Sequence, residues 1–340
     1  MGILLTSVVI SRTYLAPDKE CENAVIAAIK DGYRLIDTAV AYANQKAVGN
    51  AIKKCIDEGI VKREELFITT KLWITEWKPE DVEKSVKLSL EELQVDYIDL
   101  FLIHQSYFIN LPEELEEKRR KGYFFDRPLI PEDDPKYRLG YNIDNLKQTW
   151  GKMEELCRAG LLHSIGVSNF SAKRVNDVLS FCSIKPAVNQ IELHPYLQQW
   201  ETKETLAKND IYLMAYFPLG GAAHVRAGDV AGPMDDPVIK RIAENHHKSP
   251  AQIMIRWAVQ RGTICIPKSV HEERIKENCN IFDFELSEEE MKDIRAIDKG
   301  HRFARPLFIA PGGTDWKELY DGEYSQEYGC LFVTFWRCLG

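Results

Sequence analysis

Seven apolar runs of this sequence end in polar residues whose side chains can take part in catalysis or binding. The residues at the ends of these runs are Asp37, Lys71, His104, Ser168 with Asn169, Gln190, Tyr216 and Lys268. Tyr42 follows shortly after the first of them. Taken singly, each has an ordinary structural interpretation, such as a solvated charge or a packed ring. Their joint placement at the ends of successive apolar runs makes a functional role for the group more probable than for any one of them.

The apolar runs are short and β-branched, and segments of helical period separate them. This alternation is typical of βαβ units and a parallel sheet. We predict eight strands, at about residues 8–12, 33–37, 66–70, 97–103, 164–167, 187–191, 211–216 and 263–267. Two helices between them carry apolar stripes at Val48, Ala51, Ile52, Cys55 and Ile56, and at Val82, Val86, Leu90 and Leu93. Capping boxes predict helix starts at Ser249, Ser269 and Ser287.

A (β/α)8 TIM barrel explains why the polar residues follow the strands, because its chemistry gathers at the carboxyl ends of the strands. The competing α/β architecture is an open dinucleotide-binding sheet, which requires G-x-G-x-x-G after its first strand, and this motif is absent from the sequence. No linker rich in Pro, Gly or Ser divides the chain. We therefore predict a single domain over 1–340, with the barrel at about 7–298, a tail at 299–340, and long rim loops at about 105–142 and 220–236.

The composition excludes several other classes of protein. The chain has 340 residues, 45% apolar, and its formal net charge of −8 argues against a nonspecific nucleic-acid binder. Its eight scattered cysteines form no C-x-x-C pair, which favours a reducing compartment without a metal site. No run approaches the roughly 20 apolar residues of a membrane span, and the start lacks a secretory leader. We expect a cytoplasmic protein with a small-molecule partner, either a monomer or a homodimer.

Only the N-terminal end carries a lipidation signal, and it is weak. Met1-Gly2 followed by Thr6 fits the N-myristoylation pattern, but so short a pattern recurs by chance and one acyl chain anchors weakly. The last Cys, Cys338, is third from the end, which excludes a prenylation motif. We expect neither modification.

Seven segments, in chain order, resemble the signature motifs of the aldo-keto reductases, nearest to the aldose and aldehyde reductase branch. They are DGYRLIDTAVAYANQKAVG, ITTKLW, DLFLIH, IGVSNF, NQIELHPY, AYFPLG and IPKSVHEERIKEN. The resemblance runs from about residue 12 to 298. It implies reduction of aldehydes or ketones to alcohols with NADPH as cofactor.

The resemblance also implies a role for each matching residue. Its catalytic residues are Asp37, Tyr42, Lys71 and His104. It implies cofactor contacts at Thr13, Asp37, Ser168, Asn169, Gln190, Tyr216, Leu219, Lys268, Ser269, Val270, Arg274, Glu277 and Asn278. Within this set, the nicotinamide carboxamide meets Ser168, Asn169 and Gln190, its ring stacks on Tyr216, and the adenosine phosphate lies near Lys268, Ser269, Arg274 and Asn278. Substrate contacts are implied at Tyr14, Trp73 and His104.

Four positions depart from the family pattern. Arg12 replaces a glycine, which puts the contact of the first strand with the cofactor in doubt. His271 replaces a small hydroxyl residue, Phe217 replaces a serine, and Gln105 replaces an aromatic residue of the substrate pocket. None of these changes removes a catalytic residue.

The catalytic set has a physical logic. A tyrosine hydroxyl ordinarily titrates near pH 10, and a neighbouring cation such as Lys71 favours its phenolate. A unit charge at about 4 Å contributes roughly 4 kcal/mol at an effective dielectric near 20, which exceeds the roughly 2.7 kcal/mol of a two-unit shift. Asp37 can keep Lys71 charged, and neutral His104 can orient the carbonyl oxygen.

Two questions stay open at the level of the sequence. A noncatalytic NADPH-binding redox sensor or structural protein is the alternative to an enzyme, and a dehydrogenase or lyase is the alternative reaction. Aromatic residues after His104 and in the tail either line the substrate pocket or pack locally: Tyr107, Phe108, Tyr123, Phe124, Phe303, Phe308 and Trp316.

Overall fold

Eight parallel strands form the centre of the molecule. The structure, a computed structural model, describes residues 10–11, 17–112, 114, 137–221, 231–304 and 320–321. The strands, in their order around the sheet, are β1 (Ile10–Ser11), β2 (Leu35–Asp37), β3 (Phe67–Leu72), β4 (Ile98–Ile103), β7 (Leu162–Ser168), β8 (Val188–Glu192), β9 (Tyr212–Tyr216) and β10 (Ile264–Ile266). Each overlaps a predicted strand, which confirms the predicted barrel. Within the described residues, no ladder joins β10 to β1.

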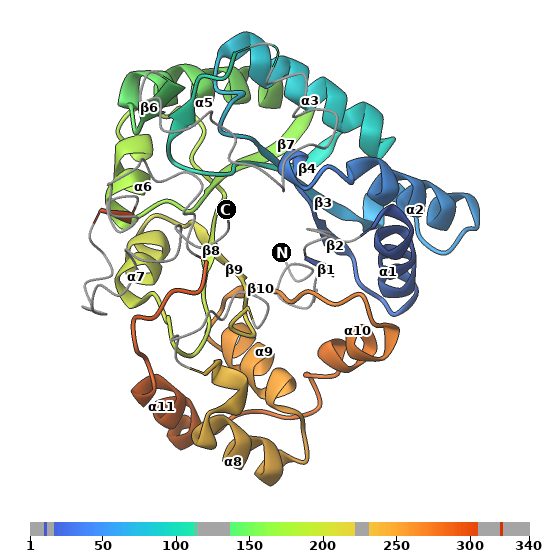
Figure 1. The fold of residues 1–340 in the computed structure, drawn as a ribbon, viewed down its shortest axis with the longest axis vertical. Helices are drawn as coiled ribbons and strands as arrows, with labels where there is room; N and C mark the ends of the chain where they lie inside the picture. Colours follow the sequence, from blue (N-terminus) through green and yellow to red (C-terminus); the bar gives the residue numbers. More distant parts are fainter. Residues whose placement is uncertain are drawn as a thin grey trace, which may run out of the picture.

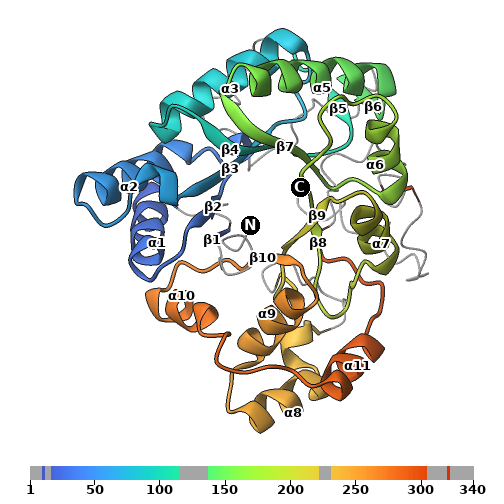
Figure 2. The same cartoon turned by 180° about the vertical axis from the view of Figure 1, so that it is seen from behind.

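Helices surround the strands on the outside (Figures 1 and 2). They are α1 (Asp18–Lys30), α2 (Gln45–Asp57), α3 (Pro79–Leu93), α5 (Ile143–Arg158), α6 (Ala172–Leu179), α7 (Trp200–Lys208), α8 (Pro237–His246), α9 (Pro250–Gln260), α10 (Glu272–Cys279) and α11 (Glu288–Ala296). The two predicted apolar stripes lie on α2 and α3 and face inward. Gly49 of α2 lies directly on the backbone of Glu92 and Leu93, where a Cβ atom would clash. The absence of a side chain therefore lets α2 and α3 pack closely.

The strands separate an inner core from an outer core because successive side chains of a strand point to opposite faces. On β4, Leu100 and Leu102 belong to the inner cluster, whereas Phe101 and Ile103 pack in the outer cluster against the helices. The inner cluster ends toward the carboxyl rim at Tyr216 of β9. This alternation decides which polar side chains at the strand ends face the barrel axis.

The structure confirms two of the three predicted capping boxes. Ser249 and Ser287 accept hydrogen bonds from the backbone N–H groups of Gln252 and Glu290, as predicted. The prediction at Ser269 is wrong, because α10 begins at Glu272 with His271 as its N-cap residue. The Ser269 hydroxyl instead accepts a bond from the His271 N–H, two residues on, and closes a turn before the helix.

The loop after β4 and the tail are described only in part. A small antiparallel pair, β5 (Phe108–Ile109) and β6 (Arg138–Gly140), brackets the loop. Phe108 packs in the outer core, so it does not line the rim. Of the tail, Tyr320 and Asp321 lie beside α6, as the short red segment in Figures 1 and 2. The predictions for Gly2, Arg12, Tyr123, Phe124, Phe308, Trp316 and Cys338 concern positions outside the described residues.

The described residues contain neither a candidate membrane span nor a candidate metal site. No helix among them is long and apolar enough to cross a membrane. Within the same ranges, no group of three or more His, Cys, Asp or Glu side chains is placed to hold a metal ion.

Candidate active site

A buried ion pair lies at the carboxyl ends of β2 and β3. The Lys71 ammonium donates to Asp37 Oδ1 at 2.5 Å and to the carbonyl oxygen of Thr38 at 2.9 Å. Both side chains are shielded from solvent, with 0% of Lys71 and 1% of Asp37 exposed. Burial of an ammonium is strongly unfavourable unless it is paired, so Asp37 holds the charge of Lys71 in place.

Tyr42 and His104 lie next to this pair. Tyr42 ends a short 3-10 helix, Val40–Tyr42, and Lys71 Nζ is 5.2 Å from the centroid of its ring. His104 follows β4, and its ring makes edge contacts with Tyr42 and Trp73 at centroid distances of 5.8 and 5.2 Å. Tyr107 belongs to the same apolar cluster. The fold thus brings together the four predicted catalytic residues and places an aromatic wall beside them.

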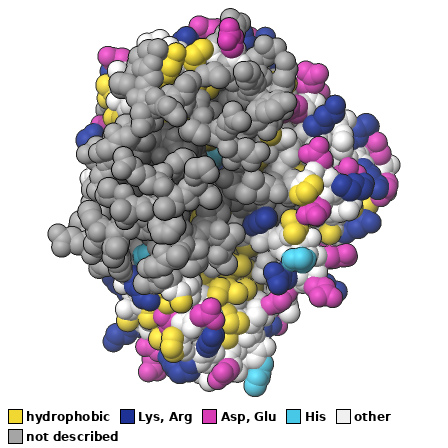
Figure 3. Space-filling model, in the orientation of Figure 1, with side chains coloured by type: hydrophobic (Ala, Val, Ile, Leu, Met, Phe, Trp, Pro, Cys, Tyr) yellow, Lys and Arg dark blue, Asp and Glu magenta, His cyan; other side chains and the backbone are white. Residues whose placement is uncertain are grey.

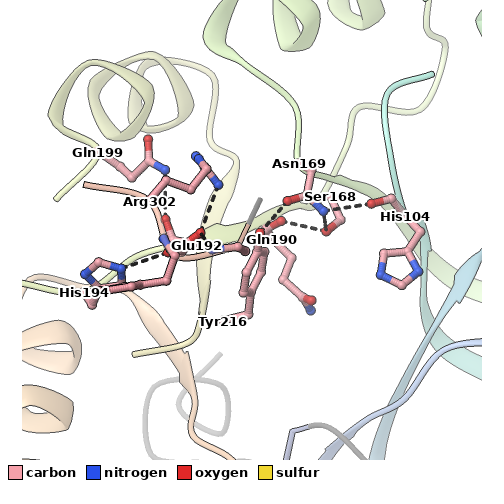
Figure 4. Close-up of polar contacts among 11 residues, drawn as sticks. His104, Ser168, Asn169, Gln190, Glu192, His194, Gln199, Tyr216 and Arg302 are labelled. Atoms are coloured by element: carbon pink, nitrogen blue, oxygen red, sulfur yellow. Dashed lines mark hydrogen bonds and ion pairs between the residues drawn. The ribbon is translucent and has the colours of Figure 1, made fainter. Parts of the chain in front are cut away.

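A hydrogen-bond network joins the residues predicted to hold nicotinamide (Figure 4). The Tyr216 hydroxyl donates to Asn169 Oδ1 at 2.7 Å, and Asn169 Nδ2 donates to the His104 carbonyl oxygen at 2.9 Å. Ser168 Oγ donates to the Gln190 carbonyl oxygen, while Gln190 Nε2 donates to Asp37 Oδ2 at 2.7 Å. The network therefore connects this cluster to the Lys71–Asp37 pair.

The residues predicted to bind the adenosine phosphate lie before and on α10. Lys268 and Arg274 are exposed, and neither forms an ion pair with any described residue. Ser269 and Asn278 are buried, whereas Val270 and Glu277 are partly buried. Two cations that have no carboxylate partner in the described part of the chain lie near the positive end of a helix dipole, a combination that favours an anion.

The structure gives less information on the remaining predicted contacts. Thr13 and Tyr14 lie outside the described residues. Leu219 is partly buried at the edge of the outer core. Phe217 has a positive φ of 53°, and its ring packs edge-on against Tyr216.

A second polar cluster, which we did not predict, lies on the other side of Tyr216 (Figure 4). Glu192, at the end of β8, is fully buried and accepts bonds from His194 at 3.0 Å and Arg302 at 3.3 Å. It also accepts the backbone N–H groups of Phe303 and Ala304. Burial alone would raise the pKa of Glu192, but the His194 hydrogen bond and the Arg302 charge outweigh it and hold the pKa at about 2.

One signal for this cluster was present in the sequence. Glu192 is two residues after Gln190 on the same strand, so both side chains lie on the same face of the sheet. A carboxylate in a buried strand requires a partner. The sequence around Glu192 does not indicate that this partner is Arg302.

The fold and the site define a class of protein: a parallel barrel with a buried lysine–carboxylate pair beside a tyrosine and a histidine at its carboxyl rim. Residues 12–299 match the Aldo/keto reductase family. The chain belongs to this family, which confirms the resemblance seen in its motifs.

Individual relatives agree with this assignment. The chain is 40% identical over 309 residues to aldo-keto reductase family 1 member A1-A of Danio rerio, with 90% of each chain covered. It is 37% identical over 302 residues to the Homo sapiens family 1 member A1, with 88% of each covered. The aldose reductase of Schistosoma japonicum has a similar structure, with a TM-score of 0.77, 33% identity, and 90% of this chain and 93% of that one covered. An aldo-keto reductase of Bombyx mori in complex with NADP gives a TM-score of 0.73 at 35% identity, with 87% and 90% covered.

Proposed function

We propose that this protein reduces aldehydes or ketones to alcohols with NADPH, with Tyr42 as the proton donor. The observation that carries the proposal is the buried Lys71–Asp37 pair beside Tyr42 and His104. Such a pair is costly to bury, and its place at the carboxyl rim of a barrel is where chemistry is expected.

The described residues fit NADPH. Exposed Lys268 and Arg274 lack a carboxylate partner among them and suit the adenosine phosphate. The amide and hydroxyl groups of Asn169, Ser168 and Gln190 suit the nicotinamide carboxamide, and the Tyr216 ring suits its face. The NADP complex of the Bombyx mori relative supports the same assignment.

When bound, NADPH supplies the hydride for the carbonyl carbon. The chain supplies the proton and the positions of the reacting groups. The Tyr42 hydroxyl gives its proton to the carbonyl oxygen, and charged Lys71 stabilises the phenolate that remains. Asp37 keeps Lys71 charged, while His104 holds the carbonyl oxygen through a ring N–H. Trp73, against the His104 ring, offers an apolar surface to the rest of the substrate.

The test is the loss of NADPH absorbance with an aromatic aldehyde, for the wild-type protein and for Tyr42→Phe. We expect Tyr42→Phe to lose roughly 10²- to 10⁴-fold in kcat, the usual contribution of a general acid. It should still bind NADPH, because Tyr42 is not part of the predicted cofactor set.

Tyr212→Phe is the matched control, since Tyr212 lies at the opposite end of β9 from Tyr216. It should turn over like the wild-type protein. Near wild-type kcat in Tyr42→Phe would refute the role of Tyr42. NADPH binding without any turnover by the wild-type protein would instead support the noncatalytic alternative.

A further inference from the structure

A buried arginine on α6 lies between the loop that follows β4 and the tail. Arg174 is in the first turn of the helix, and only 5% of its side chain is exposed. Its Cζ atom lies 4.6 Å from the centroid of the Tyr141 ring. A guanidinium group carries five N–H donors and keeps its charge, so its burial requires a carboxylate and further hydrogen-bond acceptors.

The tail supplies a carboxylate. Asp321 Oδ2 lies 2.9 Å from Arg174 Nε, and Oδ1 lies 3.4 Å from Nη2, so both carboxylate oxygens face the guanidinium. The hydroxyl of Ser171, the N-cap residue of α6, donates to the same carboxylate at 2.5 Å. In Figure 1 the tail is the short red segment beside α6. Asp321 therefore provides a counter-charge for the buried cation.

The loop after β4 supplies a further acceptor. Arg174 Nη1 donates to the hydroxyl oxygen of Ser106, which has no exposed surface. Two residues earlier, the His104 carbonyl oxygen accepts a hydrogen bond from Asn169 Nδ2 at 2.9 Å (Figure 4). Asn169 and Arg174 are five residues apart, on the segment that leaves β7 and begins α6. This segment therefore holds the loop after β4 on both sides of Gln105.

The part of the loop that is held in this way lies beside the proposed proton donor. The His104 ring contacts Tyr42 and Trp73, and Tyr107, next to Ser106, belongs to the apolar cluster of both. A shift of Ser106 would therefore move His104 and Tyr107 relative to Tyr42. The predicted phosphate site is remote from these contacts, because α10 and α6 lie on opposite sides of the barrel (Figures 1 and 2).

We propose that Arg174 is a positioning residue for carbonyl reduction, which fixes Ser106 and so the place of His104, and that Asp321 of the tail holds Arg174 for this purpose. The inference rests on the function proposed above. Arg174 touches neither the substrate nor the reacting atoms in this mechanism and acts only through the loop. Its loss should therefore lower kcat/KM for the aldehyde and leave the Kd for NADPH almost unchanged.

The first experiment compares Ser106→Ala with the wild-type protein. This change removes the acceptor in the loop and keeps the ion pair between Arg174 and Asp321. We expect kcat/KM for an aromatic aldehyde to fall roughly tenfold, the effect of one hydrogen bond from a charged donor. The Kd for NADPH should stay within about twofold. Ser180→Ala is the matched control, because the Ser180 hydroxyl donates to a backbone carbonyl at the other end of α6, and no change is expected.

The second experiment separates positioning from stability. Asp321→Asn leaves the charge of Arg174 buried without this carboxylate, so both Tm and kcat/KM should fall. Combining it with Arg174→Met removes both charges, and Tm should recover because no unpaired charge stays buried. The aldehyde kcat/KM of this double variant should remain low, because Ser106 still lacks its donor. Asp293→Asn is the control, since it breaks an exposed pair with Arg241 and should change neither quantity.

A third variant closes the cycle. Adding Ser106→Ala to the Arg174→Met, Asp321→Asn protein should have no further effect on kcat/KM, because the hydrogen bond is already gone. Three results would overturn this inference and leave the proposed function intact: an unchanged kcat/KM in Ser106→Ala, a recovery of kcat/KM together with Tm in the double variant, or additive effects in the cycle. A wild-type protein that reduces no aldehyde would overturn the proposed function itself.

Discussion

Glu192 is a carboxylate with no exposed surface, and four donors surround it: His194, Arg302 and the backbone N–H groups of Phe303 and Ala304. Its pKa of about 2 lies below the ordinary value because these contacts outweigh the effect of burial. A depressed carboxyl pKa stabilises the folded state above the unfolded pKa, and this contribution is lost as the pH falls through the folded pKa. Glu192 thus makes the attachment of residues 302–304 depend on pH.

We predict that Glu192→Gln flattens the dependence of stability on pH between about 4.5 and 2. The depressed pKa corresponds to roughly 3 kcal/mol of unfolding free energy that the wild-type protein has above this range and loses within it. Urea unfolding of both proteins at several pH values measures the difference. Glu83→Gln is the matched control, because Glu83 also has a pKa of about 2, owing to hydrogen bonds from Lys152 and Lys87, but lies at the surface. Solvent screens that site, so its variant should change little. Parallel pH profiles for wild type and Glu192→Gln would contradict the prediction.

At the scale of the element, α10 presents its N-terminus and two exposed cations on one side of the barrel. The helix starts at Glu272, and Lys268 lies in the segment just before it. Arg274 lies in its first turn and Lys276 in its last. An anion near the N-terminus gains from both the helix dipole and the guanidinium group, whereas a charge in the last turn does not contribute.

Arg274→Ala should therefore weaken NADPH far more than NADH, which lacks the 2′-phosphate. We expect the Kd for NADPH to rise roughly 10- to 100-fold, as for loss of a charge-assisted hydrogen bond, with little change for NADH. Lys276→Ala removes the same charge from the same helix and should leave both affinities unchanged. Titration of cofactor fluorescence measures all four values. Equal kcat/KM for both cofactors in the wild-type protein, unaffected by Arg274→Ala, would reject the phosphate site.

At the scale of the whole molecule, the chain has a net negative charge, and its cofactor, NADPH, is also an anion. Figure 3 shows acidic and basic side chains interspersed around α1, α2 and α10 on the described part of that face. With a formal net charge of −8, the protein as a whole does not attract NADPH. Recognition of the cofactor must therefore be local, and it is separated from the tail, which contacts the rim beside α6.

Removal of residues 315–340 tests this separation. The truncation takes away Tyr320 and Asp321 but leaves Lys268, Arg274 and the four proposed catalytic residues. We expect KM and selectivity among aldehydes to change far more than the Kd for NADPH. A folded truncation with the same aldehyde profile as the full chain would show that the tail only packs on the barrel.

The local pattern of the sequence determined the barrel and the positions of the proposed catalytic residues. Strand alternation and helical period are short-range, and parallel strands place their carboxyl ends at one rim, so Asp37, Lys71 and His104 could be placed before any contact was known. The start of α10 could not, because the Ser269 hydroxyl closes a turn with His271 instead of capping a helix.

Only the tertiary structure decided which distant side chains meet. Glu192 pairs with Arg302, 110 positions later, and Arg174 pairs with Asp321, 147 positions later. Phe108 packs in the outer core, while its neighbour Tyr107 belongs to the apolar cluster that contains Tyr42. These pairings depend on the path of the chain between the elements, and periodicity carries no information about that path. A buried charge indicates that a partner exists, because the cost of its desolvation must be offset. Only the fold shows which residue is that partner.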